Sequence, residues 1–361
     1  MSQATLDVVV TSTPVPSGPA EGLTGLVLNG NWRVLQRLQR DPGDDGAARS
    51  ACYRAVSVKT GHVAFVKAYD FRHDEFAGNT EKLERMLSEF NNEKRIHEHC
   101  KKSSLHRVTQ IYDHGVEVVG GEAVQYIVCE FADRSLRTYH PPGQAEVPAH
   151  ERLVALRQIA SAVVQLHQAG VAHQDVKPSN AVCFDDGIVK ITDLGSSSCI
   201  HFPAPPHDDE PYAGQPNYAP YELLYSEVKP SNWHRRRYGC DVFLLGNLIF
   251  TSFVGGSLTA LAMHFLDEQH HPVNYSAPYE ELIPDLEAAH ELLIDSFIGE
   301  VAPPCIAKDL ASLIRSLCHP DPRKRGLDKV STKGDPPYNL HRVVGTLNTL
   351  YLRAKFDAQR Q

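Results

Sequence analysis

Apolar and polar positions alternate along the first third of the chain, in blocks separated by polar loops. The blocks are WRVLQRL (32–38), SACYRAVSV (50–58), HVAFVKAYDF (62–71), HRVTQIYDHGV (106–116) and AVQYIVCEFA (123–132). A period of two residues, together with many β-branched and aromatic side chains, is typical of β-strands. The pattern therefore predicts five strands in this part of the chain.

Between residues 79 and 100 the period changes to that of a helix. The apolar positions of this segment are Leu83, Met86, Leu87, Phe90 and Ile96. Asn79 or Thr80 is the expected capping residue at its start. Five strands and one helix predict a small sheet domain that ends near Ala132.

Beyond Ala132 the helical period dominates. One predicted helix ends near Gly170, and its apolar face comprises Leu156, Ile159, Val163 and Leu166. The sequence AVCF-DDG-IVKI (181–191) then predicts a hairpin with an Asp-Gly turn. Further helices are expected at 241–254, 257–268, 279–297, 307–318 and 339–357. The fold class is therefore α+β.

The predicted domain organisation has three parts. Residues 1–24 are rich in Ser, Thr, Pro and Gly, which predicts a flexible tail. A sheet domain over residues 25–132 and a mainly helical domain over residues 133–361 follow. A chain of this length is expected to form two such units.

The charge balance excludes one large class of partner. The 361-residue chain has 36 Lys and Arg against 44 Asp and Glu, a net charge of −8. Nucleic-acid binders need a basic surface, so we expect no nucleic-acid partner. The eight cysteines form no CxxC pair and the N-terminus lacks a signal-peptide pattern, which indicates a reduced, cytoplasmic protein with buried thiols.

The apolar stretch over residues 242–263 is long enough to span a membrane. It is either a membrane span or a buried core helix. Asp241 precedes it, Asn247 lies inside it, and the pair Gly255-Gly256 interrupts it. These residues favour the core helix, and we expect no membrane partner.

The chemistry is concentrated in two short stretches, VAHQDVKPSN (171–180) and KITDLG (190–195). The predicted hairpin brings Asp175 and Asp193 to the same end of the structure. Asn180 and Asp193 offer oxygen ligands for Mg²⁺, which takes few protein ligands beside phosphate oxygens. Asp175 can orient a hydroxyl and accept its proton, while Lys177 can neutralise charge on a moving phosphoryl group. The set predicts phosphoryl transfer.

These stretches resemble the protein kinase family. The family pattern H-x-D-x-K-x-x-N is matched by His173, Asp175, Lys177 and Asn180, and its D-F-G motif by residues 193–195. In the family this histidine is largely structural, and we give His173 no chemical role.

Further family motifs follow in the right order. VAFVK matches the strand lysine with Lys67, and the implied helix partner is Glu93, with Glu89 and Glu84 as alternatives. YAPYELL matches the end of the activation segment. The residues that match fold-supporting positions of the family are Glu222, Asp241, Gly246 and Arg325.

The resemblance implies a bilobal fold with a small five-stranded N-lobe carrying one helix and a mainly helical C-lobe. It implies ATP and Mg²⁺ as cofactors and serine or threonine hydroxyls of proteins as acceptors. The implied contacts to the adenine are Phe65, Glu130, Ala132 and Val182. The motifs are similar to those of soluble bacterial kinases of the eukaryotic type, some of which act in signalling or phage defence.

Four departures from the family pattern matter. The loop at 40–49 has only Gly43 and Gly46, and its three aspartates would repel a triphosphate. Phe65 replaces an alanine that roofs the adenine. Gln174 replaces an arginine that meets a phosphorylated activation segment, so ordering of the segment should not need phosphorylation. Gln215 stands where serine/threonine kinases have a threonine.

Two other functions stay open beside the kinase. A pseudokinase would keep the fold as a nucleotide-binding or protein-interaction module, and a related phosphotransferase would act on small molecules. HRRR (234–237) is either a solvated face or a docking patch for acidic partners. His270-His271 is a loop without partners at metal spacing. The oligomeric state is left open.

Overall fold

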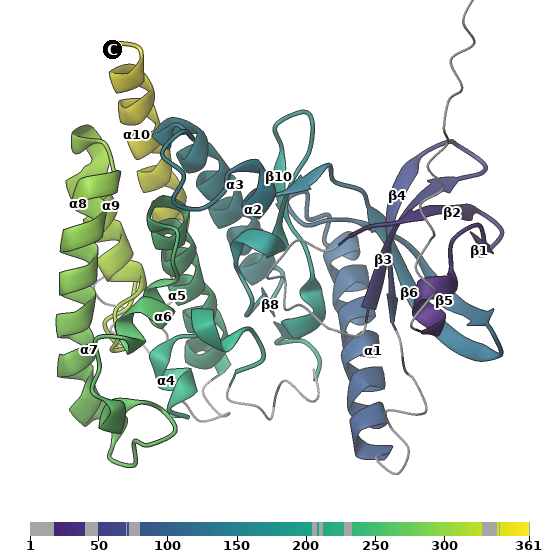
Figure 1. Cartoon of the computed structure of the whole chain (residues 1–361), viewed down its shortest axis with the longest axis horizontal. Coiled ribbons are helices and arrows are strands. Elements are labelled where there is room, and N and C mark those ends of the chain that lie inside the picture. Colours follow the sequence, from purple (N-terminus) through teal and green to yellow (C-terminus); the bar gives the residue numbers. More distant parts are fainter. Residues whose placement is uncertain are drawn as a thin grey trace, which may run out of the picture. The chain divides into compact units, whose positions relative to one another are not determined.

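The computed structural model describes residues 18–39, 50–69, 71, 80–203, 208, 212–226, 233–326, 338 and 340–360. The loop at 40–49 and the first 17 residues of the expected tail lie outside the described residues. The chain divides into two compact units (Figure 1). The first comprises Met1–Gly78 and Asp113–Cys129, and the second Asn79–Tyr112 and Glu130–Gln361.

The first unit is built on a six-stranded sheet in the order β1-β2-β3-β4-β6-β5. The strands are β1 (Val27–Leu28), β2 (Trp32–Arg37), β3 (Ser50–Ser57), β4 (Val63–Tyr69), β5 (Ile111–Val119) and β6 (Glu122–Glu130). The five predicted strands are all present. The two-residue β1 is an addition that is too short to leave a periodic signal in the sequence.

Residues 18–24 are part of this unit rather than a tail. Pro19–Gly22 form a short 3₁₀ helix, η1, in which Ala20 is buried. The Tyr53 hydroxyl donates to the Ala20 carbonyl at 2.5 Å, and Arg37 pairs with Glu21 at 2.6 Å. The prediction of a tail through residue 24 is therefore wrong for residues 18–24, because these contacts with distant strands outweigh the flexible composition.

The second unit is mainly helical and carries the remaining elements. Its longer helices are α1 (Thr80–Lys102), α3 (Ala149–Gln168), α5 (Trp233–Val254), α6 (Leu258–Met263), α7 (Tyr279–Leu293), α9 (Pro304–Leu317) and α10 (Leu340–Ala358). The short helices are α2 (Leu136–Tyr139), α4 (Tyr221–Leu224), α8 (Gly299–Val301) and the π-helix η7 (Ile294–Ile298). The 3₁₀ helices are η3 (Pro178–Asn180), η4 (Leu194–Ser196), η5 (Pro216–Tyr218) and η6 (Glu268–His270).

Five short strands complete the second unit. They are β7 (Arg134–Ser135), β8 (Val171–Ala172), β9 (Ala181–Cys183), β10 (Val189–Ile191) and β11 (Ser198–Cys199). The predicted hairpin is the antiparallel pair β9–β10, and β11 pairs with β8. The helix α1, which the sequence assigned to the sheet domain, belongs to this unit instead. Its contacts come from residues about a hundred positions away, such as Ser197, which no local pattern reveals.

The core of the second unit surrounds α3 and α5, and α10 packs along α3 (Figure 1). The apolar stretch over residues 242–263 is divided between α5 and α6, and its part in α5 is buried from Val242 to Phe253. Its polar residue is satisfied there, because Asn247 accepts from the Leu258 amide at 2.8 Å and donates to the Tyr218 carbonyl at 3.2 Å. Within the described ranges, no helix has the length and apolar character to cross a membrane.

Candidate active site

A buried carboxylate on α5 fixes the stretch that carries the predicted chemistry. Asp241 accepts the backbone amides of His173 at 2.8 Å and Gln174 at 2.7 Å, and the ring of His167 lies 2.9 Å from it. The Asp241 side chain is 0% exposed. It acts through the backbone and supports the fold, and its contacts are with two backbone amides and the His167 ring.

His173 connects this stretch to the strand before Asp193. Its Nε2 donates to the Thr192 carbonyl at 3.0 Å, while its Nδ1 accepts the Asp175 amide at 3.2 Å. A carbonyl only accepts and an amide only donates, so the ring proton sits on Nε2. The ring is buried and both nitrogens are occupied, which agrees with a structural role.

Asp175, Lys177 and Asn180 form a compact cluster. The Oδ2 atom of Asp175 lies 2.9 Å from the Lys177 ammonium and 2.8 Å from the Asn180 amide nitrogen. Its Oδ1 accepts the backbone amide of Gln215 at 3.1 Å. These donors fix the carboxylate, and its remaining lone pairs can still accept a proton from a bound hydroxyl.

Asp193 follows β10 at the end of the same hairpin. Its backbone adopts the left-handed region with φ 59° and ψ 77°, which is uncommon for a residue with a side chain and clusters at functional sites. The preceding Thr192 amide donates to the Asn180 carbonyl at 2.9 Å. The hairpin therefore links the backbone beside Asp193 to Asn180.

Glu93 on α1 lies beside the segment that follows Asp193. A Cβ placed on Gly195 would be 3.3 Å from the Asp193 Oδ1 and 3.4 Å from the Glu93 Oε2. Of the two alternatives, Glu89 pairs with Arg85 at 3.1 Å on the helix surface, and Glu84 is exposed. The geometry thus favours Glu93 as the glutamate that faces the site.

The donor set fits a magnesium ion that phosphate oxygens complete. The Asn180 side chain donates two hydrogen bonds from its nitrogen, at 2.9 and 2.8 Å, so its carbonyl oxygen remains for a cation. Across the described ranges, no three His, Cys, Asp or Glu side chains gather as a metal site. Mg²⁺ does not need such a cage, because it usually keeps water and phosphate ligands beside one or two protein oxygens.

Phe65 and Lys67 lie on one face of β4, as strand alternation predicted. The β3–β4 register runs without a shift through the pairs Arg54–Phe65 and Cys52–Lys67. Both side chains are half-buried, while Ala64 and the other intervening positions are buried on the opposite face. No bulge therefore turns Phe65 away. Lys67 belongs to the first unit and Glu93 to the second, so their pairing stays a prediction.

The other predicted adenine contacts lie in the second unit. The Glu130 carboxylate pairs with Lys190 at 2.6 Å and accepts the Gln110 amide at 3.2 Å, so its side chain is engaged within this unit. Ala132 is half-buried, and so is Val182 on β9. Their contact with a nucleotide stays a prediction.

Two arginines of the basic run HRRR (234–237) are buried, contrary to the prediction. Arg236 and Arg237 are only 2% and 1% exposed, so neither belongs to a solvated face or a docking patch. Arg236 donates to the Asp208 carbonyl at 2.6 Å, and Arg237 donates to the side-chain oxygen of Gln174. A sequence signal existed, because Arg237 precedes Asp241 by four residues and so shares its helix face.

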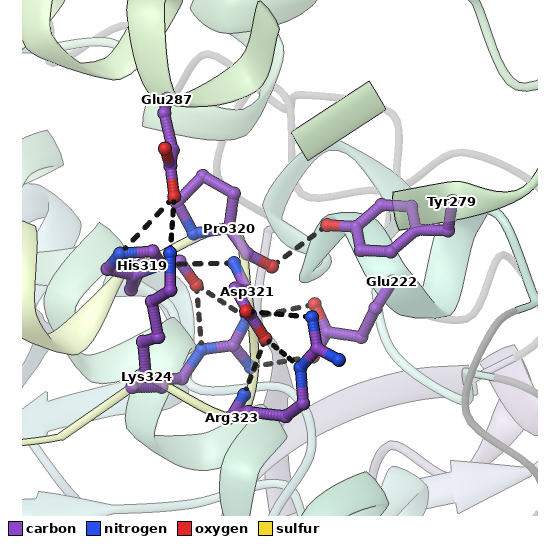
Figure 2. Close-up of polar contacts among 9 residues, drawn as sticks. Glu222, Tyr279, Glu287, His319, Pro320, Asp321, Arg323 and Lys324 are labelled. Atoms are coloured by element: carbon purple, nitrogen blue, oxygen red, sulfur yellow. Dashed lines mark hydrogen bonds and ion pairs between the residues drawn. The ribbon is translucent and has the colours of Figure 1, made fainter. Parts of the chain in front are cut away.

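A buried ion pair joins Glu222 (Figure 2), at the end of the activation segment, to Arg325 in the loop after α9. The two nitrogens of Arg325 lie 2.6 and 2.8 Å from the two oxygens of Glu222, and both side chains are 0% exposed. Burial lowers the pKa of Arg325, but the Glu222 carboxylate raises it overall above its ordinary value. Figure 2 also shows Tyr279, whose hydroxyl donates to the Pro320 carbonyl at 2.9 Å.

Comparison with known proteins identifies the family. The sequence matches the family model described as the protein kinase domain over residues 46–328. The chain therefore belongs to the protein kinase family. The sheet-based first unit, the helical second unit and the order of the motifs all agree with this membership.

Several curated relatives are similar over part of the chain. The human hormonally up-regulated neu tumor-associated kinase is 26% identical over 220 residues, 60% of this chain and 26% of its own length. The Wee1-like protein kinase of Arabidopsis thaliana is 31% identical over 134 residues, covering 37% and 24%. The serine/threonine-protein kinase PTK2/STK2 of Saccharomyces cerevisiae is 29% identical over 119 residues, covering 30% and 14%.

The chain therefore spans only a small part of these relatives, namely 26%, 24% and 14% of their lengths. All three come from eukaryotes. They give no support to the bacterial origin that the motifs suggested.

Proposed function

We propose that this protein is an ATP- and Mg²⁺-dependent kinase that phosphorylates serine or threonine hydroxyls of protein substrates. The observation that carries the proposal is the cluster in which Asp175 contacts Lys177 at 2.9 Å and Asn180 at 2.8 Å. Family membership and the name of the yeast serine/threonine-protein kinase support the same assignment.

Each residue of the cluster takes a role that its contacts allow. Asp175 orients the acceptor hydroxyl and takes its proton, and Lys177 neutralises charge on the transferred group. Asn180 and Asp193 would hold Mg²⁺, which supplies charge stabilisation to the phosphate oxygens. We assign Lys67, supported by Glu93, to the ATP phosphates, and Phe65, Glu130, Ala132 and Val182 to the adenine.

The test is direct transfer from labelled ATP. With Mg²⁺ and a proteome extract, we expect label in proteins, recovered as phosphoserine or phosphothreonine after hydrolysis. A chelator should abolish the label, and Asp193→Ala should serve as the inactive control. Label confined to small molecules would favour the small-molecule phosphotransferase, while ATP binding without any transfer would favour the pseudokinase.

The pseudokinase deserves a test of its own because Phe65 shares a face with Lys67. If its ring covers the adenine, Phe65→Ala should enlarge the nucleotide slot. We expect this variant to use N6-benzyl-ATP at least about tenfold better than the wild type does. A difference of one methylene group in an apolar pocket already changes kcat/KM by about this factor. The measurement is kcat/KM for the analogue relative to ATP.

Val63→Ala provides the matched control, because Val63 is half-buried on the same face of β4 but lies further from Lys67. It should leave the analogue preference unchanged. Equal analogue use by the wild type and Phe65→Ala would remove Phe65 from the adenine contacts.

A further inference from the structure

Arg237 is a buried cation whose position needs an explanation. It is 1% exposed, its Nη1 donates to the Gln174 side-chain oxygen, and its Nη2 lies 3.9 Å from the Asp208 carboxylate. Burial, with the Arg236 charge beside it, lowers the pKa of Arg237 to about 10. A buried guanidinium is costly unless its hydrogen bonds serve the structure.

Gln174 connects Arg237 to the start of the activation segment. Its Nε2 donates to the Ser196 carbonyl at 2.7 Å and to the Ser198 hydroxyl at 2.9 Å. Its backbone, at φ 64°, is held by Asp241. We call these contacts of Gln174 with Arg237, Ser196 and Ser198 the Gln174 bridge.

Arg237 sets the orientation of the bridge. An arginine only donates hydrogen bonds, so the amide oxygen of Gln174 must face it. Both hydrogens on the amide nitrogen are then directed away from Arg237, towards Ser196 and Ser198. Without Arg237 only the Ser196 carbonyl would favour this orientation, because a flipped amide would place its oxygen against that carbonyl.

The segment that the bridge holds begins directly after the residues at the proposed metal site. Ser196 and Ser198 follow residues 193–195, and Asn92 of α1 donates to the Ser197 carbonyl at 2.9 Å. Ser197 and Ser198 are 0% exposed. Their hydroxyls are out of reach of a modifying enzyme in this arrangement, so the segment is ordered here by neutral and cationic side chains.

We propose that Arg237 is a positioning residue: acting through Gln174, it holds Ser196–Ser198 in place without any phosphate group. The kinetic part of the test rests on the proposed function, whereas the structural part does not. The role differs from simple filling of the core, because it depends on the donor groups of Arg237 and not on its volume.

The primary measurement is amide hydrogen exchange on phosphatase-treated protein. Arg237→Met keeps an unbranched side chain but removes the donors, and we expect exchange in residues 194–199 to rise by about tenfold or more, the order of a lost charged hydrogen bond. Arg236→Met is the matched control, since Arg236 is equally buried on the same helix but donates to Asp208. It should leave residues 194–199 unchanged.

Exchanging the residues at positions 174 and 237 provides a further test, because a role limited to filling space would not predict recovery of the exchange rate. Gln174→Arg alone places two guanidinium groups together and should loosen the segment. The double variant Gln174→Arg/Arg237→Gln restores a donor at position 174 and an acceptor oxygen at position 237, so exchange should return towards the wild-type rate. Arg237→Lys, which keeps a cationic donor, should fall between the wild type and Arg237→Met and covers failure of the methionine variant to fold.

Activity provides the second readout. In Arg237→Met we expect kcat to fall while the KM for ATP changes little. The lost hydrogen bond joins Arg237 to Gln174, and we assign neither residue to the nucleotide. Unchanged exchange at 194–199, or an equal rise in the Arg236→Met control, would overturn the proposal. A local rise in a protein whose wild type transfers no phosphate would uphold the bridge and reject the proposed kinase activity.

Discussion

Asp175→Ala is expected to lower kcat for phosphoryl transfer by a factor of about 10² to 10⁴, the usual contribution of a positioned general base. The variant removes the carboxylate that Lys177 and Asn180 surround at 2.9 and 2.8 Å. The KM for ATP should change little, because we assign no nucleotide contact to this side chain. Steady-state kinetics at saturating ATP measure the effect.

The fold should survive this substitution. The backbone amide of Asp175 bonds to His173, and its carbonyl accepts from Asn180 at 2.9 Å, so both backbone contacts persist without the side chain. Thermal unfolding should confirm a stability close to that of the wild type. Asp185→Ala, which removes an exposed carboxylate from the nearby hairpin turn, is the matched control and should keep its activity. Transfer by Asp175→Ala at the wild-type rate would reject the assigned base.

The geometry of the proposed catalytic cluster was predictable because its members are close in sequence. Asp175, Lys177 and Asn180 lie within six positions, and a single hairpin of regular register adds Asp193. Short-range geometry of this kind follows from turn chemistry and strand pairing alone. Strands β3 and β4 of the first unit were predictable for a related reason, since buried positions alternate along each of them.

Long-range contacts were not predictable from local patterns. The sequence showed that Gln174 departs from the family, but the partner that replaces the missing contact lies 63 positions away in Arg237. The composition of a run of arginines predicts solvated surface. Only the spacing of four residues between Arg237 and Asp241 indicated that Arg237 faces inward. The same limit explains the assignment of α1, whose contact through Asn92 to Ser197 spans 105 positions.

Arg325→Met is expected to destabilise the protein by about 3–5 kcal/mol, the cost of leaving one partner of a buried ion pair uncompensated. Glu222 would keep its charge with no cation at 2.6 Å, and both of these side chains are 0% exposed. Two carbonyls, of Gly239 and His319, would also lose the donors that now lie 3.0–3.2 Å away. Denaturant unfolding at constant slope gives the free energy directly.

A neighbouring arginine on the same turn supplies the control. Arg323 contacts Asp321 (Figure 2). The two side chains lie 2.8 Å apart, and that of Arg323 is 55% exposed. The Asp321 side chain is only 5% exposed, but its carboxylate also accepts the Arg323 backbone amide at 2.9 Å, a contact that Arg323→Met keeps. Arg323→Met should therefore cost clearly less than Arg325→Met. If Arg325→Met cost no more than this control, the Glu222 pair could not be a support of the fold.

The double variant Glu222→Met/Arg325→Met separates the ion pair from the other contacts of Arg325. Removing both charges eliminates the buried unpaired carboxylate, and apolar replacements of buried pairs are often close to neutral. The double variant should therefore be more stable than Arg325→Met alone, although the Gly239 and His319 carbonyls still lack their donors. A double variant less stable than the single one would show that Arg325 acts mainly through those carbonyls. The coupling between the two substitutions thus measures how much of the stability at the end of the activation segment comes from the charge of Glu222.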